Sequence, residues 1–298
     1  MSDTQKQPRK ESDAASAEPV LSKEQAQQLA HLKSAQARRK KAEEEILEGS
    51  KGNEFNEILR TAMWAVAFAL VIRTLFFEPF NIPSGSMKPT LLIGDYIFVS
   101  KPSYGYSRYS FPFSPAFIKG RVWGDKLPQR GDVAVFRLPS NPSIDYIKRV
   151  VALPGERVQM IEGRLYINGV RTEREFIRRE TDIEHGGVHV EMLLYRETLP
   201  GGTTHMIYEE GDNGPLDNTA EFVVPEGHYF AMGDNRDNSQ DSRVTTHVGS
   251  IPLENMIGRA TRIFFSTDGT ASLIEFWKWP FSTRFSRLFD KIEADTTP

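Results

Sequence analysis

The sequence predicts a mainly β protein that is preceded by one apolar helix near its N-terminus. Beyond residue 80 the chain consists of short segments rich in β-branched and aromatic residues, without a convincing amphipathic helix. With 298 residues, of which 39% are hydrophobic, the chain can bury a substantial core, and its length suggests about two domains. A mean hydropathy of -0.43 excludes a protein with many membrane spans but allows a single one.

The predicted strands are short apolar runs or alternate apolar with polar residues. They cover residues 96–99, 133–138, 146–153, 158–161, 164–167, 206–208, 229–232 and 259–265. Glu162-Gly163 joins two of them and is typical of a tight hairpin turn. Two stretches between strands, residues 103–128 and 181–202, are expected to be loops, the second of them a polar insertion.

The most hydrophobic stretch of the chain covers residues 58–80 (ILRTAMWAVAFALVIRTLFFEPF). Its uncharged centre, residues 61–72, is short. Arg60 and Arg73 can extend their side chains toward water, so that the segment reaches the ~20 residues that a span requires. A buried core helix is the alternative. Because no nearby segment could complete a helical bundle around it, the sequence favours a transmembrane helix over residues 58–80.

The distribution of basic residues around this stretch predicts its orientation. Residues 38–60 include six basic residues, whereas residues 78–100 include only Lys88. The positive-inside rule therefore places the N-terminus in the cytoplasm and residues 81–298 outside it, with a single pass through the membrane. A cleaved signal peptide is not expected, because 57 residues precede the stretch and no small-residue cleavage site follows it.

Residues 1–57 are predicted to form a cytoplasmic tail that is partly disordered and partly helical. Residues 1–20 are polar, charged and poor in aromatics, which is typical of disorder. From there the composition favours a helix, and Ser22 and Gln25 have the spacing of a capping box. The apolar face of this helix is thin, so we expect it to be solvated or to depend on a partner. Residues 49–52 (GSKG) are expected to break it.

Charge and composition exclude several classes of function and of site. The net charge of -3 provides no global field for nucleic acid, so no nucleic-acid partner is expected. The absence of cysteine excludes cysteine nucleophiles, thiolate metal sites and disulfides. The six histidines form neither an HExxH motif nor a ligand cluster, so no metal and no other cofactor is expected.

Directly after the apolar stretch, the sequence PSGSMKPT at residues 83–90 can present a serine on a rigid turn. Pro83 and Pro89 fix their φ angles, and Gly85 allows a sharp turn with free backbone N–H groups around Ser86. Such turns are common, so the motif alone is weak support for a nucleophile. The serine also needs a base, and the sequence offers neither a GxSxG elbow nor a well-placed histidine.

Lys148 is the alternative base. In the predicted strand around it, alternation places Tyr146, Lys148 and Val150 on one face. An ordinary lysine, with a pKa of ~10.4, is protonated and cannot accept a proton. Burial between apolar neighbours would lower this pKa toward the ~7–8 that suits a general base. A solvated strand lysine is the other interpretation, and spacing alone does not decide between the two.

A polar loop, GDNRDNSQDSR at residues 233–243, follows one of the predicted strands. Its short acceptors, hydroxyls and two arginines predict an internally hydrogen-bonded loop that could orient a neutral lysine and hold itself together with an Asp–Arg pair. A calcium loop of the EF-hand type is the alternative. Ser242 and Val248 stand where such a loop needs its glycine and its bidentate glutamate, which argues against it.

Five motifs, in order IPSGSMKPTL, GDYIFVSKPSYG, RGDVAVFRLP, YIKRVVALPGERV and MGDNRDNSQDSR, closely resemble those of bacterial type I signal peptidase. The resemblance extends from about residue 80 to about residue 258. It implies a serine endopeptidase in which Ser86 is the nucleophile and Lys148 is the general base. It also implies an oxyanion hole made by the backbone N–H of Ser86 and the hydroxyl of Ser84.

The same resemblance implies supporting roles for the polar loop. Ser239 would orient the lysine, Asp241 and Arg243 would form a structural pair behind it, and Asp234 belongs to the same loop. Two residues beside the lysine are candidates to line the substrate site: Tyr146 and Ile147.

Fold, substrate and location also follow from the resemblance. The fold would be an extracytoplasmic, mainly β catalytic core with a smaller, variable β insertion at about residues 155–228. The partners would be membrane lipid and secretory preproteins with small residues at positions −1 and −3, as in Ala-x-Ala. Cleavage would take place at the outer face of the bacterial cytoplasmic (inner) membrane, without a cofactor.

Some features depart from the family or are not covered by its motifs. This chain shows one transmembrane helix where many members have two, and Lys88 stands where an apolar residue is common. The aromatic segment FWKWPF at residues 276–281 could lie at the membrane interface or pack onto the β core. Rival functions are a Ser–Lys peptidase with another task, such as pilin maturation or repressor self-cleavage, and a non-catalytic tethered domain that binds exported chains.

Overall fold

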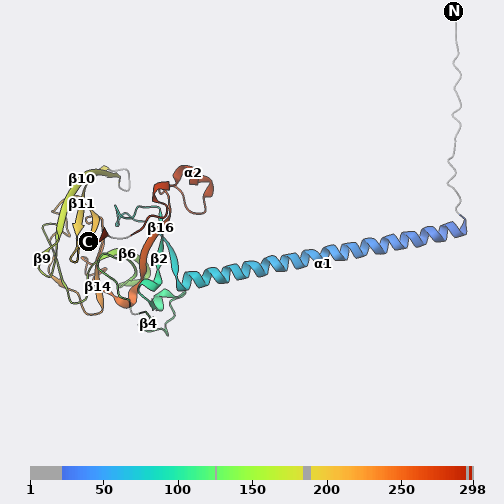
Figure 1. The fold of residues 1–298 in the computed structure, drawn as a ribbon, viewed down its shortest axis with the longest axis horizontal. Helices are drawn as coiled ribbons and strands as arrows, with labels where there is room; N and C mark the ends of the chain where they lie inside the picture. The colour runs from blue at the N-terminus through green and yellow to red at the C-terminus, as the bar shows by residue number, and fades with distance from the viewer. Residues whose placement is uncertain (1–21, 125, 184–188, 293–294, 297–298) are drawn as a thin grey trace, which may run out of the picture. The chain divides into compact units, whose positions relative to one another are not determined.

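The computed structural model describes residues 22–124, 126–183, 189–292 and 295–296. The chain divides into two compact units, Met1–Val66 and Ala67–Pro298, and all the strands belong to the second unit (Figure 1). The segment predicted to be disordered, residues 1–20, lies outside the described residues.

One helix, α1 (Lys23–Leu75), precedes all the strands. Its start is capped as predicted, because the backbone N–H of Gln25 donates to the Ser22 hydroxyl and the backbone N–H of Ser22 donates to the Gln25 side chain. The predicted break at residues 49–52 is wrong, since the helix continues through them. A glycine inside a helix costs only about 1 kcal/mol relative to alanine, and the helix-forming residues on both sides offset this cost.

The last part of α1 contains a segment, Asn56–Leu75, that is long and apolar enough to cross a membrane, with a mean hydropathy of 1.6. None of this window is buried, and Trp64 and Phe68 are among its exposed side chains. A core helix of a soluble domain would bury such side chains, so length, composition and exposure all favour a span. Its orientation in the membrane stays a prediction.

The predicted span, residues 58–80, extends too far along the chain. The helix ends at Leu75, and the following residues form strand β1 (Phe77–Asn81). Pro79 cannot continue a helix and restricts the residue before it to extended conformations. The backbone groups of this segment pair with β2 (Asp95–Ser100) instead.

The main sheet has seven strands in the order β1-β2-β16-β5-β6-β14-β15, each antiparallel to its neighbours. Besides β1 and β2, its strands are β5 (Val133–Leu138), β6 (Asn141–Ala152), β14 (His228–Met232), β15 (Ile251–Pro252) and β16 (Met256–Ser266). The central strand β5 is buried almost throughout, so the main hydrophobic core lies on both of its faces. The sheet therefore provides a rigid support for side chains on β6 and after β1.

A smaller β region is inserted between β6 and β14, so the predicted mainly β fold with an inserted region is confirmed. Figure 1 shows β9, β10 and β11 on the side of the β unit opposite to β2 and β16. The region builds two four-stranded sheets, β13-β7-β8-β9 and β10-β11-β12-β17, and the second sheet takes β17 from the C-terminal segment and not from the insertion. Their strands are β7 (Arg157–Ile161), β8 (Arg164–Ile167), β9 (Val170–Arg171), β10 (Glu173–Ile183), β11 (His189–Thr198), β12 (Thr203–Glu209), β13 (Phe222–Val223) and β17 (Asp295–Thr296).

Two local predictions for this part of the chain have opposite outcomes. The tight turn at Glu162-Gly163 is confirmed, with φ angles of 48° and 68° between β7 and β8. The polar loop predicted over residues 181–202 is wrong, because β10 and β11 form a long antiparallel hairpin. β11 buries Met192 and Leu194 on one face, and its charged residues hide this alternation in the sequence. Residues 184–188 lie outside the described part of the hairpin.

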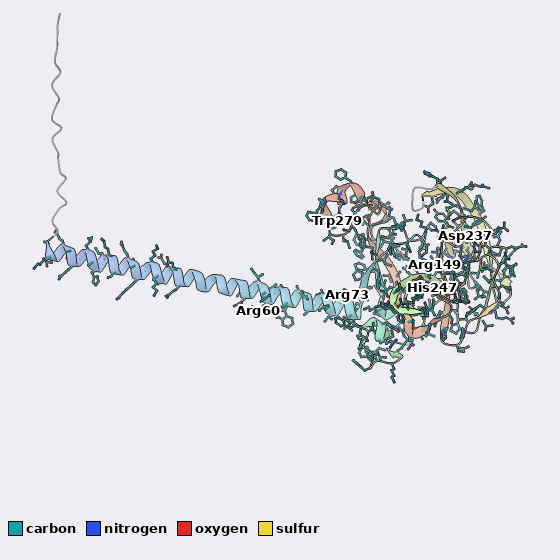
Figure 2. All side chains as sticks on the ribbon, turned by 180° about the vertical axis from the view of Figure 1, so that it is seen from behind. Arg60, Arg73, Arg149, Asp237, His247 and Trp279 are labelled. Carbon is teal, nitrogen blue, oxygen red and sulfur yellow. The ribbon has the colours of Figure 1, made fainter. Side chains whose placement is uncertain are left out.

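Residues 103–128 are largely irregular, as predicted. In their described part, 103–124 and 126–128, the regular elements are β3 (Tyr106–Ser107), β4 (Arg121–Trp123), the 3-10 turn Arg108–Ser110 and the end of the 3-10 turn Lys101–Ser103. Part of the C-terminal segment packs onto the β core, which is one of the two alternatives for its aromatic residues. Its backbone packs along β16, where Phe289 N–H donates to Ile263 O at 2.7 Å. Trp279, which Figure 2 labels, lies against Phe265 with ring centroids 4.7 Å apart, whereas Phe281 is 92% exposed. Membrane contact of these exposed rings stays a prediction.

Candidate active site

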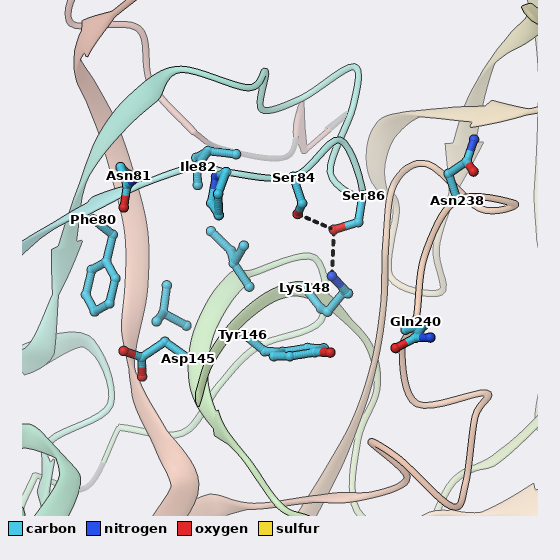
Figure 3. A pocket seen from close by; sticks show the side chains of 13 residues that line it. Phe80, Asn81, Ile82, Ser84, Ser86, Asp145, Tyr146, Lys148, Asn238 and Gln240 are labelled. Atoms are coloured by element: carbon cyan, nitrogen blue, oxygen red, sulfur yellow. Dashed lines mark hydrogen bonds between the residues drawn. The ribbon is translucent and has the colours of Figure 1, made fainter. Parts of the chain in front are cut away.

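Ser86 and Lys148 meet in a buried position, although 62 residues separate them in the chain. Ser86 lies in the loop that connects β1 to β2, and Lys148 lies on β6. The Lys148 amine nitrogen, Nζ, donates a hydrogen bond to Ser86 Oγ at 2.7 Å, as Figure 3 shows. The two side chains are only 8% and 4% exposed, so little water reaches the contact.

The strand pairing explains why a lysine can be accommodated here. Lys148 pairs with Ala134 on β5, whose small side chain leaves room for the long lysine side chain. Alternation along β6 places Tyr146 on the same side, and Lys148 Nζ lies 5.3 Å from the centre of the Tyr146 ring. The Tyr146 hydroxyl is in turn 3.0 Å from His247 Nε2, a contact that the sequence does not predict.

The environment of Lys148 favours its neutral form. Burial lowers the pKa of Lys148 from 10.5 to about 8, because the charged amine loses its hydration. The carboxylates of Asp241 and Asp234 oppose this shift, and the Arg243 guanidinium adds to it. A substantial share of the amine is therefore neutral near pH 8, as a general base requires.

Ser84 lies next to the nucleophile. Its Oγ is 3.4 Å from Ser86 Oγ, and its exposed side chain faces the same cavity. A hydroxyl in this position is close to where the oxygen of an attacked carbonyl would lie, so its position is compatible with donating a hydrogen bond to an oxyanion.

A cavity of about 510 Å³ opens onto the pair and is shown in Figure 3. Its wall includes both candidate lining residues, Tyr146 and Ile147. Sequence reasoning missed the other side chains of the wall: Phe80, Asn81, Ile82, Pro83, Val135, Asp145, Asn238 and Gln240. Apolar side chains such as Ile82, Val135 and Ile147 form part of the lining, beside polar ones, so the cavity offers both apolar surface and hydrogen-bonding groups to a ligand.

The loop of residues 233–243 contacts the turn that carries Ser86. The backbone N–H of Asn235 donates to Ser86 O at 3.1 Å, and its side-chain amide donates to Gly85 O at 3.2 Å. Gly233 makes this contact possible, since a Cβ there would lie 2.5 Å from Ser86 O and 2.2 Å from Ser239 Oγ. The loop therefore fixes the position of the turn that carries the nucleophile through its backbone carbonyl groups.

Ser239 is buried in this loop, close to the nucleophile turn. No hydrogen bond between Ser239 Oγ and the Lys148 amine is present among the described residues, so the orienting role of Ser239 stays a prediction.

Asp241 and Arg243 form the ion pair that the resemblance implies. Arg243 Nε and Nη2 each donate to one Asp241 oxygen at 2.9 Å, and Gly233 N–H donates to Asp241 Oδ2 at 3.0 Å. Burial alone would raise the pKa of Asp241, but Arg243 holds it below its usual value. Both oxygens of Asp241 are occupied, which argues against an EF-hand-type calcium loop here.

Asp234 forms a second buried ion pair, with Arg149, which sequence reasoning missed. Arg149 Nε and Nη2 donate to its two oxygens at 2.8 and 2.6 Å, and Thr90 Oγ1 donates to it at 2.5 Å. Arg149 follows Lys148 on β6, so strand alternation sends the two cations to opposite faces. Burial would raise the pKa of Asp234, but Arg149 lowers it. Figure 2 labels Arg149 within the β unit.

These parts together can perform acyl transfer. They comprise a serine, a base within hydrogen-bond distance, a neighbouring hydroxyl and an adjacent apolar cavity. The one potential metal-ligand group found among the described residues consists of Glu209, Asp217 and Asp237, none of which lines the cavity.

Comparison with known proteins identifies the family of this chain. The family described as "Signal peptidase, peptidase S26" matches residues 55–265. Signal peptidase I of Rickettsia typhi is 44% identical over 247 residues, covering 77% of this chain and 90% of that protein. The enzyme of Rickettsia akari is 43% identical over 256 residues, covering 78% and 93% of the two chains. A crystal structure of an Enterococcus faecalis signal peptidase I is 27% identical, covering 45% of this chain and 97% of that one, with a TM-score of 0.27. The chain belongs to the signal peptidase (peptidase S26) family.

Proposed function

We propose that this chain is a membrane-anchored serine endopeptidase that uses Ser86 as nucleophile and Lys148 as general base to remove signal peptides from secretory preproteins. The observation that carries the proposal is the buried 2.7 Å contact between Lys148 Nζ and Ser86 Oγ beside an apolar cavity. The family to which the chain belongs is one of serine peptidases that remove signal peptides, which supports the substrate class.

The reaction begins when the neutral amine of Lys148 accepts the hydroxyl proton of Ser86. Ser86 Oγ then attacks the scissile carbonyl carbon, and the Ser84 hydroxyl and the backbone N–H of Ser86 stabilise the oxyanion. The Lys148 ammonium returns the proton to the departing amine, which leaves an ester on Ser86. Lys148 next accepts a proton from water, which hydrolyses the ester and regenerates the serine.

The cavity supports a preference for small residues at the −1 and −3 positions of the preprotein, as in Ala-x-Ala. Tyr146 and Ile147 line the cavity together with Lys148. We expect bulky side chains next to the scissile bond to collide with this wall and to keep the carbonyl away from Ser86 Oγ.

Cleavage is placed at the outer face of the cytoplasmic membrane, with the N-terminus in the cytoplasm. The apolar segment Asn56–Leu75 and the basic residues that precede it support this orientation. Secretory preproteins emerge on the outer face, so the catalytic unit would meet its substrates beside the lipid.

The pH dependence of preprotein cleavage tests this mechanism. We expect kcat/KM to be low at about pH 6 and to rise to a plateau through an apparent pKa near 8, because only the neutral amine of Lys148 accepts a proton. The measurement uses the purified full chain in detergent with lipid and a preprotein that carries alanine at −1 and −3.

The matched control is the same preprotein with a tryptophan at −1, which we expect to remain uncleaved at every pH. A rate that is independent of pH across this range would exclude a lysine base. Equal cleavage of both preproteins would contradict the proposed specificity, and no cleavage of either would contradict the proposed substrate class.

A further inference from the structure

Three carboxylates from different segments converge outside the catalytic cavity. Glu209 ends β12, Asp217 lies in the loop that follows, and Asp237 lies in the polar loop behind Ser86. One oxygen from each residue lies within 4.8 Å of those from the other two. Glu209 and Asp217 are fully buried, and Asp237 is half-buried. Figure 2 labels Asp237 within the β unit.

The two buried carboxylates are each held through one oxygen, and the other oxygen has no partner. Arg174 Nη1 donates to Glu209 Oε1 at 3.1 Å, and Gly214 N–H donates to Asp217 Oδ2 at 2.5 Å. Glu209 Oε2 and Asp217 Oδ1 are buried without any hydrogen-bond partner. Buried carboxylate oxygens are normally paired, so these two unpaired atoms are available to a ligand.

Asp237 is held in the same way. The backbone N–H of Glu210 donates to its Oδ2 at 2.6 Å, and its Oδ1 faces Gly214. A Cβ on Gly214 would lie 2.7 Å from Asp237 Oδ1 and 3.2 Å from Asp217 Oδ2, so the missing side chain leaves this space open. The three carboxylates therefore present oxygens toward a shared space.

Of the three carboxylates, Glu209 alone has an arginine partner among the described residues, Arg174. Arg174 also pairs with Asp212 at 2.7 Å, and Arg236 Nη1 donates to Glu197 at 3.0 Å. Within the described part of the chain, neither Asp217 nor Asp237 forms an ion pair with a basic side chain.

We propose that Glu209, Asp217 and Asp237 form a site for one divalent cation, and that calcium is the best-fitting ion. A ligand set made only of oxygens selects hard cations. The three oxygens lie within 4.8 Å of one another, a separation that calcium can bridge with calcium–oxygen distances of about 2.3–2.6 Å. Calcium also accepts irregular coordination, whereas magnesium demands near-ideal octahedral geometry at about 2.0–2.1 Å, which carboxylates fixed on three separate segments are less suited to provide.

The bound ion would join three segments. It would connect the end of β12 and the loop of residues 210–218 to the polar loop that contacts the Ser86 turn. Asp237 lies two residues before Ser239, so the ion would stabilise the support of the active site without touching the reacting atoms.

Calcium binding to the full chain tests this proposal. The detergent-solubilised protein is treated with EDTA, dialysed and titrated with CaCl₂ in a calorimeter, and its unfolding temperature is measured in parallel. We expect saturable binding at one site and an unfolding temperature that rises with calcium concentration. NaCl at matched ionic strength should not reproduce this rise, and MgCl₂ should bind more weakly.

Variants locate the ion. Asp237→Asn changes a half-buried residue, so this variant should fold. Glu209→Gln removes a carboxylate with little change in the shape of the side chain. Each substitution should weaken calcium binding at least about tenfold, because a charged ligand is lost. Glu175→Gln is the matched control, since it removes an exposed carboxylate of the same β region and should leave binding unchanged.

Three results would overturn the proposal. The first is that neither calcium nor magnesium binds saturably. If Glu209→Gln then also unfolds at or above the wild-type temperature, the cluster holds a proton in place of a cation. Calcium binding that persists in both variants would place the ion elsewhere. Magnesium binding as tight as that of calcium would overturn the assignment of the ion.

Discussion

Replacing Lys148 with methionine is expected to lower kcat/KM for preprotein cleavage by about 10²- to 10⁴-fold, the range that a general base contributes. Methionine has a similar length and no amine, so the variant loses the group that lies 2.7 Å from Ser86 Oγ and could take its proton. The fold should survive, because the substitution removes a buried amine whose pKa is already lowered by burial. The unfolding temperature below pH 8 should equal or exceed that of the wild type.

Lys119→Met is the matched control, since Lys119 is an exposed lysine outside the catalytic cavity. It should cleave preproteins at the wild-type rate. If Lys148→Met kept more than about a tenth of the wild-type activity, Lys148 would not be the base.

The second large effect concerns stability. Asp234→Ala should lower the free energy of unfolding by about 3–5 kcal/mol, because it leaves the fully buried Arg149 guanidinium without its bidentate partner. Thr90 would lose a hydrogen-bond acceptor as well. Urea unfolding of the full chain in detergent, followed by near-ultraviolet circular dichroism, measures the change.

Glu221→Ala is the control for this prediction, because it breaks an ion pair with Arg157 that lies at the surface. Water and salt screen such pairs, so its stability should change little. Equal stability changes in the two variants would show that the buried position of Asp234 does not matter.

Much of the fold could be predicted from the sequence because its signals are local. Residues 133–138 form an apolar run, and Glu162-Gly163 carries the turn chemistry that the hairpin requires. The incorrect predictions concern segments whose conformation depends on contacts with distant parts of the chain. Pro79 ends the helical region earlier than hydropathy indicates, and the charged residues of β11 obscure its alternation.

The candidate site shows the same division. Ser86 and Lys148 can be named from motifs, although neither motif alone identifies a catalytic residue. The structural role of Arg149 could not be predicted, because charged residues usually lie at the surface, whereas this one is 1% exposed. The Glu209, Asp217 and Asp237 cluster depends on three segments that only the folded chain brings together.

Covalent trapping on the full chain most directly tests the central claim that Ser86 is the nucleophile and Lys148 activates it. The protein is treated with a β-lactam-type acylating agent, and the adduct is located by mass spectrometry in the wild type, Ser86→Ala and Lys148→Met. We expect one adduct, on Ser86, that is absent from both variants. An adduct on another residue, or preprotein cleavage by Ser86→Ala, would contradict the account.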